Sequence, residues 1–362
     1  MIGSPPPHGG QVRQVTDLLG IAPVALLDFS ANLNPDGPPA AVLSRLRASF
    51  DDSTVITNYP DLDELEVRRS LAEYAGISTE SISVANGFVP LLDSVLRPLP
   101  IQRCVVPVPA FVEYRRTLQQ SRIEVVPYIL TTGSGFACHT EDLFRDSCDA
   151  ILLENPQNPS GVLYSRDTML RIVEEARNRE IYVFLDEAFV DYCPEASLIR
   201  EVVRYPNLIV FRSLTKFFGM AGLRIAYAAT NAELCGRVQE SIAPWSVTSL
   251  ASVAACAAVR DIDYAPQAIG RNNSRRDQMR AAIEALGIHV YPSAANFLLL
   301  RLPKSIDSRQ VWEQMIRRHR ILLRHCANYE GLGDGHLRVA VRTEAENDRL
   351  IAALRCEIGN EQ

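Results

Sequence analysis

Residues 213–224 read SLTKFFGMAGLR and follow directly on the short apolar run 208–211. The segment contains one lysine, Lys216, and one arginine, Arg224, eight residues apart. Thirty residues before the lysine, Asp186 ends another short apolar run. Short apolar runs bounded by polar residues are typical of buried strands. Because open α/β sheets bind ligands at the carboxyl ends of their strands, these three side chains predict one site at that edge.

Strand-like and helix-like stretches alternate between about residue 80 and residue 230. The helical pattern is clearest at 165–179, where Leu170, Val173 and Ala176 recur at a spacing of three residues. Alternation of this kind predicts an α/β fold whose mostly parallel sheet is covered by helices on both faces. The expected strands are 104–107, 124–128, 150–153, 182–185, 208–211 and 224–229.

Length and pattern together predict more than one domain, because 362 residues exceed what a single core usually serves. After residue 265 the pattern changes to a smaller α+β arrangement. Its expected elements are a long charged helix at 270–286, a strand at 296–302, a helix at 308–318 and a strand at 337–341. We therefore expect an N-terminal arm that joins the small domain (1–45), a large cofactor-binding domain (46–265) and a C-terminal small domain (266–362).

Composition argues for a soluble enzyme rather than a nucleic-acid or membrane protein. The chain is 47% hydrophobic and 22% charged, and its net charge of -6 gives no electrostatic reason to expect nucleic acid or an anionic membrane. The eight cysteines show no paired spacing of the zinc type, so we expect no metal. The N-terminal residues do not resemble a signal peptide, and no apolar run approaches a membrane span. We expect a cytoplasmic protein.

The lysine, the carboxylate and the arginine together indicate pyridoxal 5'-phosphate as the cofactor. A lysine that forms a Schiff base needs an aldehyde cofactor beside it, with a carboxylate at the ring nitrogen and cations and hydroxyls at the phosphate. Lys216 is then the catalytic residue and Asp186 the partner of the ring nitrogen. The other expected contacts are Asn158 at the ring oxygen, Phe111 on the ring face, and Ser213, Thr215, Arg224 and the backbone N–H groups of Gly87 and Phe88 at the phosphate. Each motif alone also fits a turn, a helix cap or a solvated loop, so the prediction depends on their joint order.

The same motifs resemble those of the fold-type-I aminotransferase superfamily. They are NPQNPSG at 155–161, DEAF at 186–189, and SLTK at 213–216 with GLR at 222–224. Four further stretches resemble a subgroup that contains histidinol-phosphate aminotransferases and threonine-phosphate decarboxylases, the latter in particular: HGG at 8–10, LDFSANLNP at 27–35, PWSV at 244–247 and LRHCANY at 323–329. The resemblance covers nearly the whole chain and implies a fold-type-I pyridoxal-phosphate transferase fold.

The resemblance also implies a homodimer with shared active sites, in which Tyr59 reaches the cofactor phosphate of the partner protomer. It implies that Arg338 binds an acidic group of the substrate, and that the other anionic end is bound by residues among Arg324, Arg342, His8 and Asn32. Three arginines in one C-terminal stretch are more cations than a single carboxylate needs, which indicates a substrate with two anionic ends. For Arg342 a role in a surface ion pair is an open alternative.

Two departures from the superfamily pattern bear on the reaction. Phe189 stands where aminotransferases usually carry a tyrosine, which favours decarboxylation. Gly87-Phe88-Val89 stands where relatives usually carry an acidic or hydroxylated residue beside the phosphate. If side chains bound the phosphate there, this change would weaken binding; backbone N–H groups would tolerate it.

The resemblance implies decarboxylation of L-threonine O-3-phosphate to (R)-1-aminopropan-2-ol phosphate and carbon dioxide, as part of cobalamin biosynthesis. The alternative is a histidinol-phosphate-type aminotransferase, and a lower-ranked one is a catalytically silent accessory protein that binds pyridoxal phosphate. The residues themselves do not decide which bond at the substrate α-carbon stands perpendicular to the cofactor ring. That orientation decides between loss of a proton and loss of carbon dioxide.

Overall fold

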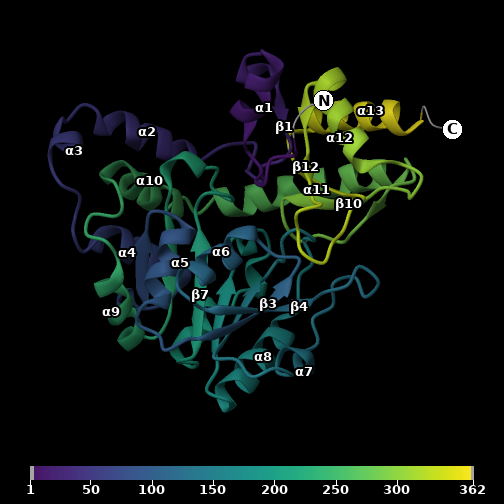
Figure 1. Cartoon of the computed structure of the whole chain (residues 1–362). Coiled ribbons are helices and arrows are strands. Elements are labelled where there is room, and N and C mark those ends of the chain that lie inside the picture. Colours follow the sequence, from purple (N-terminus) through teal and green to yellow (C-terminus); the bar gives the residue numbers. More distant parts are fainter. Residues whose placement is uncertain (1–3, 360–362) are drawn as a thin grey trace.

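The computed structural model describes residues 4–359 and has a seven-stranded central sheet (Figure 1). In spatial order its strands are β2 (Ile82–Ala85), β8 (Ala226–Ala229), β7 (Leu208–Ser213), β6 (Tyr182–Asp186), β5 (Ala150–Glu154), β3 (Arg103–Val108) and β4 (Glu124–Ile129). Strands β4, β3, β5, β6 and β7 pair in parallel, whereas β8 pairs antiparallel with both β7 and β2. The predicted mostly parallel sheet is therefore confirmed.

Helices cover both faces of this sheet. Those of the large domain are α2 (Ala40–Ser49), α3 (Thr54–Thr57), α4 (Leu65–Ala75), α5 (Phe88–Leu96), α6 (Val112–Gln120), α7 (Thr140–Leu143), α8 (Arg166–Asn178), α9 (Ala232–Ser241) and α10 (Ser249–Val259). Val183 and Leu185 of β6 pack in one hydrophobic cluster with α4, α8 and α10, and Phe184 packs in another with α5, α6 and α9. Strands that are buried on both faces need apolar side chains at every position, which explains the continuous apolar runs.

A smaller unit contains both ends of the described chain. Its helices and strands are α1 (Val12–Leu19), β1 (Leu27–Asp28), α11 (Tyr264–Glu284), β9 (His289–Val290), β10 (Phe297–Arg301), α12 (Ser308–His319), β11 (Ile321–Leu322), β12 (Arg324–His325), β13 (His336–Ala340) and α13 (Glu344–Gly359). Strands β12, β13, β10 and β9 form an antiparallel sheet in that order, and β1 pairs in parallel with β11.

A separate hydrophobic cluster joins Val15 and Phe29 of the N-terminal segment to Trp312 and Leu354. In Figure 1, α1 lies next to α12 and α13. This packing supports the proposed division into an N-terminal arm, a large domain and a C-terminal small domain, which we keep as a proposal.

Some element boundaries differ from those predicted. Strand β8 begins at Ala226 rather than at 224, because Arg224 has a left-handed backbone (φ 55°, ψ 64°) that no strand accommodates. Helix α11 begins at Tyr264, so it crosses the predicted boundary at 265/266. Strand β2 was not predicted, because its sequence ISVA mixes polar and small residues. Within residues 4–359 no helix combines the length and apolar character of a membrane span.

Candidate active site

A cavity of about 300 Å³ lies at the carboxyl ends of β5, β6 and β7. Its walls also include the N-terminal segments 7–9 and 30–32 and residues of β12 and β13. Most of the predicted site residues, although distant in sequence, meet in this cavity. Those that line it are Lys216, Asp186, Asn158, Ser213, Thr215, Arg224, Phe111, Phe88, Arg338, Arg324, His8 and Asn32.

The electrostatics of Lys216 suit a group that exchanges protons near neutral pH. Burial lowers the pKa of its amino group to about 8, and the positive charges of Arg338 and Arg224 act in the same direction. The nearby carboxylate of Asp186 opposes this shift of the lysine pKa. A lysine that loses its proton readily can act both as a nucleophile and as a proton carrier.

Asp186 is the buried last residue of β6. Burial raises the pKa of its carboxyl to about 6, while a hydrogen bond from Tyr114 opposes the rise. The Tyr114 hydroxyl donates to Oδ2 at 2.6 Å and the backbone N–H of Ala188 donates to Oδ1 at 2.9 Å. No role was predicted for Tyr114, although it follows Phe111 by only three residues. In the structure the two rings lie 5.5 Å apart. That spacing places both on one side of a helical turn.

Hydroxyls, backbone N–H groups and a guanidinium gather where a phosphate was predicted. The hydroxyl oxygens of Ser213 and Thr215 lie 2.7 Å apart. Gly87 has a φ of +93°, and a Cβ at this position would lie 2.6 Å from Nη2 of Arg224. Helix α5 begins at Phe88, so the N–H groups of its first turn are free of intrahelical partners. The absence of a side chain at residue 87 thus makes room for the arginine, which accounts for the unusual glycine there.

Asn158 is joined to the substrate side of the cavity through Arg338. Nη1 of Arg338 donates to Oδ1 of Asn158 and also, at 3.1 Å, to the hydroxyl of Tyr329. Nη2 of the same arginine donates to the carbonyl oxygen of Ser30 at 3.2 Å. Tyr329 lines the cavity and is buried, but no role was predicted for it although it lies in the motif LRHCANY.

Arg324 and Arg338 face each other across β12 and β13, where they are register partners. Both are almost completely buried, with exposed fractions of 3% and 5%. Like charges directly opposite each other on neighbouring strands are destabilising. Tyr329 contacts both arginines, because its hydroxyl accepts from Arg338 and its ring lies 5.0 Å below the Arg324 guanidinium. Two buried cations at one cavity wall are an arrangement that anionic ligands stabilise.

The guanidinium of Arg324 also holds the N-terminal segment in place. Nη1 donates to the carbonyl oxygen of Pro6 at 3.0 Å, and Nη2 donates to that of Pro7 at 2.6 Å. Further bonds reach the carbonyl of His325 at 2.6 Å and Oδ1 of Asn328 at 2.7 Å. Arg324 therefore connects one wall of the cavity to the segment that carries His8.

The N-terminal segment supplies His8 and Asn32 to the cavity. Nε2 of His8 lies 2.9 Å from Oε1 of Glu113 at the start of α6. Asn32 is buried, and its Oδ1 atom has no hydrogen-bond partner within residues 4–359. A buried acceptor without a donor is costly, so a ligand that donates to it would be favoured.

Three predicted residues, Gly87, Arg342 and Tyr59, do not line the cavity. The N–H group of Gly87 donates to the carbonyl oxygen of Ala85 at 2.7 Å, so it is not available to a phosphate as predicted.

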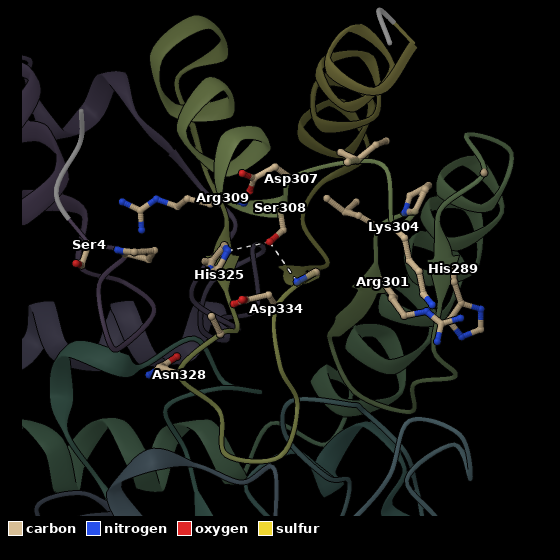
Figure 2. Close-up of a pocket in the computed structure, with 17 residues that line it drawn as sticks. Ser4, His289, Arg301, Lys304, Asp307, Ser308, Arg309, His325, Asn328 and Asp334 are labelled. Carbon is tan, nitrogen blue, oxygen red and sulfur yellow. Dashed lines mark hydrogen bonds between the residues drawn. The ribbon is translucent and has the colours of Figure 1, made fainter. Parts of the chain in front are cut away.

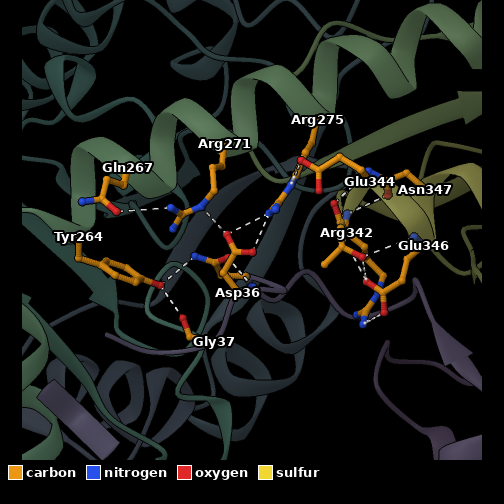
Figure 3. Close-up of polar contacts among 12 residues, drawn as sticks. Asp36, Gly37, Tyr264, Gln267, Arg271, Arg275, Arg342, Glu344, Glu346 and Asn347 are labelled. Atoms are coloured by element: carbon orange, nitrogen blue, oxygen red, sulfur yellow. Dashed lines mark hydrogen bonds and ion pairs between the residues drawn. The ribbon is translucent and has the colours of Figure 1, made fainter. Parts of the chain in front are cut away.

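Arg342 donates to the carbonyl of Asp28 at 3.0 Å and to Glu346 at 2.8 Å. Figure 3 shows Arg342 and Glu346 near the ion pairs that join Asp36 to Arg275. Arg342 therefore forms an ion pair, as the alternative prediction has it, and we do not propose Arg342 as a substrate ligand.

Tyr59 lies away from the cavity of its own chain. Its side chain is 79% exposed, and its ring stacks on Trp245 with centroids 4.6 Å apart. The role predicted for Tyr59 concerns the cofactor of a second protomer, and it stays a prediction.

A second hollow of about 1500 Å³ lies between the N-terminal segment and the small domain (Figure 2). Its charged residues have mixed signs, as Figure 2 shows for Arg301, Lys304, Asp307 and Asp334. None of the lysine, carboxylate and hydroxyl groups predicted for the cofactor lines this hollow. We therefore place the chemistry in the smaller cavity despite the difference in size.

The smaller cavity fits pyridoxal phosphate on the evidence of its own groups. Asp186 is a buried carboxylate at one end, and Arg224 with the Ser213 and Thr215 hydroxyls forms a cradle beside Gly87. The partly buried Lys216 lines the same cavity. If bound, the cofactor would be held by Asp186 at its ring nitrogen and by the cradle at its phosphate.

Comparisons with known proteins agree with this reading. Residues 24–354 match the pattern of the family "Aminotransferase class I and II". The chain is 35% identical to the threonine-phosphate decarboxylase of Salmonella typhimurium over 96% of its length and 95% of the relative's. It is 32% identical to the histidinol-phosphate aminotransferase of Roseiflexus castenholzii, over 95% and 93%. The solved L-threonine-O-3-phosphate decarboxylase of Porphyromonas gingivalis superposes with a TM-score of 0.82 at 26% identity, over 93% and 100% of the two chains.

Proposed function

Since the chain belongs to the aminotransferase class I and II family, whose members use pyridoxal phosphate, we propose that it decarboxylates L-threonine O-3-phosphate. Pyridoxal phosphate is its cofactor, as the sequence predicted. The observation that carries the proposal is the pair of buried arginines, Arg324 and Arg338, which line one cavity from neighbouring strands. Phosphothreonine has two anionic ends, a carboxylate and a phosphate, whereas histidinol phosphate has only the phosphate.

In the proposed reaction Arg338 orients the substrate carboxylate, and Arg324, His8 and the side-chain N–H group of Asn32 bind the substrate phosphate. When bound, the cofactor supplies an electron sink for the electron pair that remains at the α-carbon. The bond between the α-carbon and the carboxylate carbon breaks, and carbon dioxide leaves. Lys216 then delivers a proton to the α-carbon, which gives the aminopropanol phosphate product.

Phe189 gives further support to decarboxylation. Its ring is buried in the cavity wall and packs edge to face on Phe297 at 5.0 Å. Phe189 thus offers no hydroxyl, and Phe297 lies under the Arg338 guanidinium at 5.3 Å. Aminotransferases of the superfamily usually carry a tyrosine at this position, whose hydroxyl assists the residue that matches Asn158 at the cofactor ring oxygen.

The second candidate is a histidinol-phosphate-type aminotransferase, which the 32% identical relative from Roseiflexus castenholzii favours. An aminotransferase also binds a dicarboxylate partner, for which two arginines are equally suited. A silent accessory protein ranks lower, because Lys216 and Asp186 both line the cavity.

We also propose a homodimer, as the family resemblance implies. The large apolar side chains exposed on residues 50–65 support it: Phe50, Ile56, Tyr59 and Leu62 are all more than half exposed. Light scattering of the purified protein measures the assembly, and a monomer at micromolar concentration would contradict this part of the proposal.

The direct test supplies purified holoenzyme with L-threonine O-3-phosphate and follows carbon dioxide release without any keto acid. A parallel reaction supplies histidinol phosphate and 2-oxoglutarate and follows glutamate formation. We expect carbon dioxide release in the first reaction and little turnover in the second. The Lys216→Ala variant is the matched control for background release, and a requirement for 2-oxoglutarate would establish the second candidate instead.

A further inference from the structure

One buried side chain of the cavity has no role in the reaction proposed above. Glu154 is the last residue of β5, lines the cavity and is only 6% exposed. Its Oε2 atom finds no hydrogen-bond partner anywhere in residues 4–359. A buried, ionised carboxylate whose oxygen receives no donor is strongly disfavoured, so the charge state of Glu154 needs an explanation.

The neighbour of Glu154 is the carboxylate assigned to the cofactor ring. Glu154 and Asp186 are register partners on the parallel strands β5 and β6, where both strands end. Two negative charges on directly paired residues repel each other, and burial increases the repulsion because the local dielectric constant is low. Two neighbouring buried carboxyl groups are difficult to ionise together, so one of them tends to keep its proton near neutral pH.

Hydrogen bonds decide which of the two keeps the negative charge. Asp186 accepts from the Tyr114 hydroxyl at 2.6 Å and from the Ala188 N–H at 2.9 Å, one donor to each oxygen. Glu154 has one oxygen without a donor. Donors stabilise the ionised form, so the charge stays on Asp186 and the proton on Glu154.

The charged and titratable groups around Glu154 agree with this assignment. Burial raises the pKa of Glu154 well above its ordinary value, and the charge of Asp186 raises it further. The backbone N–H group of Asn158 and the positive charge of Arg338 act in the opposite direction, each with a smaller effect on the pKa of Glu154. The Tyr114 hydroxyl also lies near Glu154, but it donates its one proton to Asp186. Lys216 also lies near Glu154, since the charge of Glu154 would raise the lysine pKa.

We propose that Glu154 is a positioning residue: a neutral carboxylic acid that carries the single proton of the Glu154–Asp186 pair and so keeps Asp186 ionised opposite the cofactor ring nitrogen. As a neutral acid, Glu154 places no uncompensated negative charge in the buried cavity wall. The proposal rests on the assignment of Asp186 to the ring and is independent of which bond the enzyme breaks.

The first test measures the stability of the ligand-free protein against pH. A group whose pKa is raised by folding stabilises the folded state at low pH, and this advantage is lost as the pH rises above about 4.5. Glu154→Gln keeps a neutral group at every pH and escapes this loss. We expect the melting temperature of Glu154→Gln minus that of the wild type to grow by about 2 °C or more between about pH 5 and about pH 8. A difference that stays constant with pH would overturn the proposal.

Glu64→Gln is the control, because Glu64 is a buried carboxyl outside the cavity whose pKa burial raises to about 7. The melting temperature of Glu64→Gln minus that of the wild type should also grow as the pH rises, but the absorbance of the cofactor should not change. The second test therefore titrates the visible absorbance of the holoenzyme. If Glu154 is already neutral, Glu154→Gln leaves the midpoint of that titration within a few tenths of a unit of the wild type. A midpoint lowered by about one unit or more would mean that a negative charge had been removed.

Infrared spectroscopy keeps the proposal testable if Glu154→Gln does not fold. The wild type at neutral pH should show the C=O stretch of a protonated carboxylic acid. This band should contain a contribution from Glu154, which Glu154→Met removes. Glu64→Gln should remove a different contribution, that of Glu64. No change of the band in Glu154→Met would overturn the assignment of the proton to Glu154. None of these readouts depends on turnover, so failure of the decarboxylase proposal would leave them interpretable.

Discussion

The two halves of the cavity are built in different ways. The cofactor half consists of residues at the ends of neighbouring parallel strands, such as Asp186 on β6 and Ser213 on β7. The substrate half joins residues from opposite ends of the chain, such as His8 and Arg338. In the first half the backbone ladder fixes the side chains. In the second half Arg324 fixes them by donating to the backbone carbonyls of Pro6 and Pro7.

This contrast implies that the two halves respond differently to substitution. Changes in the cofactor half should lower turnover while the fold survives, because the sheet is held by its own ladder and by two hydrophobic clusters. Changes in the substrate half should weaken binding of the substrate and leave the cofactor content unaltered. The predictions below test that separation.

The largest effect is expected for Lys216→Ala. Lys216 is the lysine of the cavity, and in the proposed reaction it both binds the cofactor covalently and moves a proton. We expect turnover to fall by at least about a thousandfold, within the range known for removal of an acid–base group. Borohydride reduction of the wild-type holoenzyme followed by peptide mapping should place the cofactor on Lys216. An adduct on Lys304 would contradict the assignment of the site.

A smaller but still large effect is expected for Asp186→Asn. A neutral amide cannot hold a proton on the ring nitrogen, so the electron sink weakens although Tyr114 and Ala188 remain in place. We expect the cofactor to be retained and kcat to fall at least about a hundredfold, as for other preorganised electrostatic groups. The measurement is steady-state kinetics together with the absorbance of the bound cofactor. Near-normal turnover would mean that another acid, such as Glu154 in the same cavity, serves the ring.

Arg324→Ala tests the substrate half. Loss of a charge-assisted partner of the phosphate costs on the order of 2–3 kcal/mol, so KM for phosphothreonine should rise about thirtyfold or more. The cofactor content should stay unchanged, because Arg224 and not Arg324 lies beside the phosphate cradle. Arg342→Ala is the matched control: it removes an arginine of the same domain that pairs with Glu346. An equal rise of KM in both variants would show that the effect is structural.

The contrast between the halves also explains how much the sequence could predict. Six of the seven strands of the central sheet, and the residues of the cofactor half, could be predicted because each of their signals is local: an apolar run followed within a few residues by a polar side chain, as with Asp186 and Ser213. The family motifs extended the prediction to Arg338 and Arg324. Arg224 was predicted as a cavity residue from its motif alone. That prediction did not depend on its backbone conformation, which the sequence misjudged by starting the strand two residues too early.

The residues that were missed depend on packing between elements. Glu154 matters because its strand is in register with that of Asp186, and register across a parallel sheet is not written in either strand alone. Tyr329 matters because it separates two arginines of neighbouring strands. Arg342 lies only four residues after Arg338, yet it points to the carbonyl of Asp28 instead of into the cavity.

The smallest effect is expected for Tyr329→Phe, which removes only the hydroxyl that accepts from Arg338. The ring remains, so its contact with the Arg324 guanidinium should persist. A hydrogen bond to a charged group is worth about 1.5–3 kcal/mol, and Arg338 keeps Asn158 and the carbonyl of Ser30 as partners, so we expect the lower end of that range. KM for phosphothreonine should rise about tenfold with kcat nearly unchanged.

Whether the hydroxyl acts at one anion site or at both can be tested with a ligand that has a single anionic group. Inhibition by inorganic phosphate, which needs only the Arg324 end, should be unaltered in Tyr329→Phe, whereas binding of phosphothreonine should weaken. Tyr291→Phe is the matched control, since Tyr291 is a buried tyrosine whose hydroxyl lies 3.4 Å from Nε2 of His336, away from the cavity. Weaker inhibition by phosphate in Tyr329→Phe would mean that the hydroxyl orders both arginines together. The substrate half would then behave as one unit rather than as two separate anion sites.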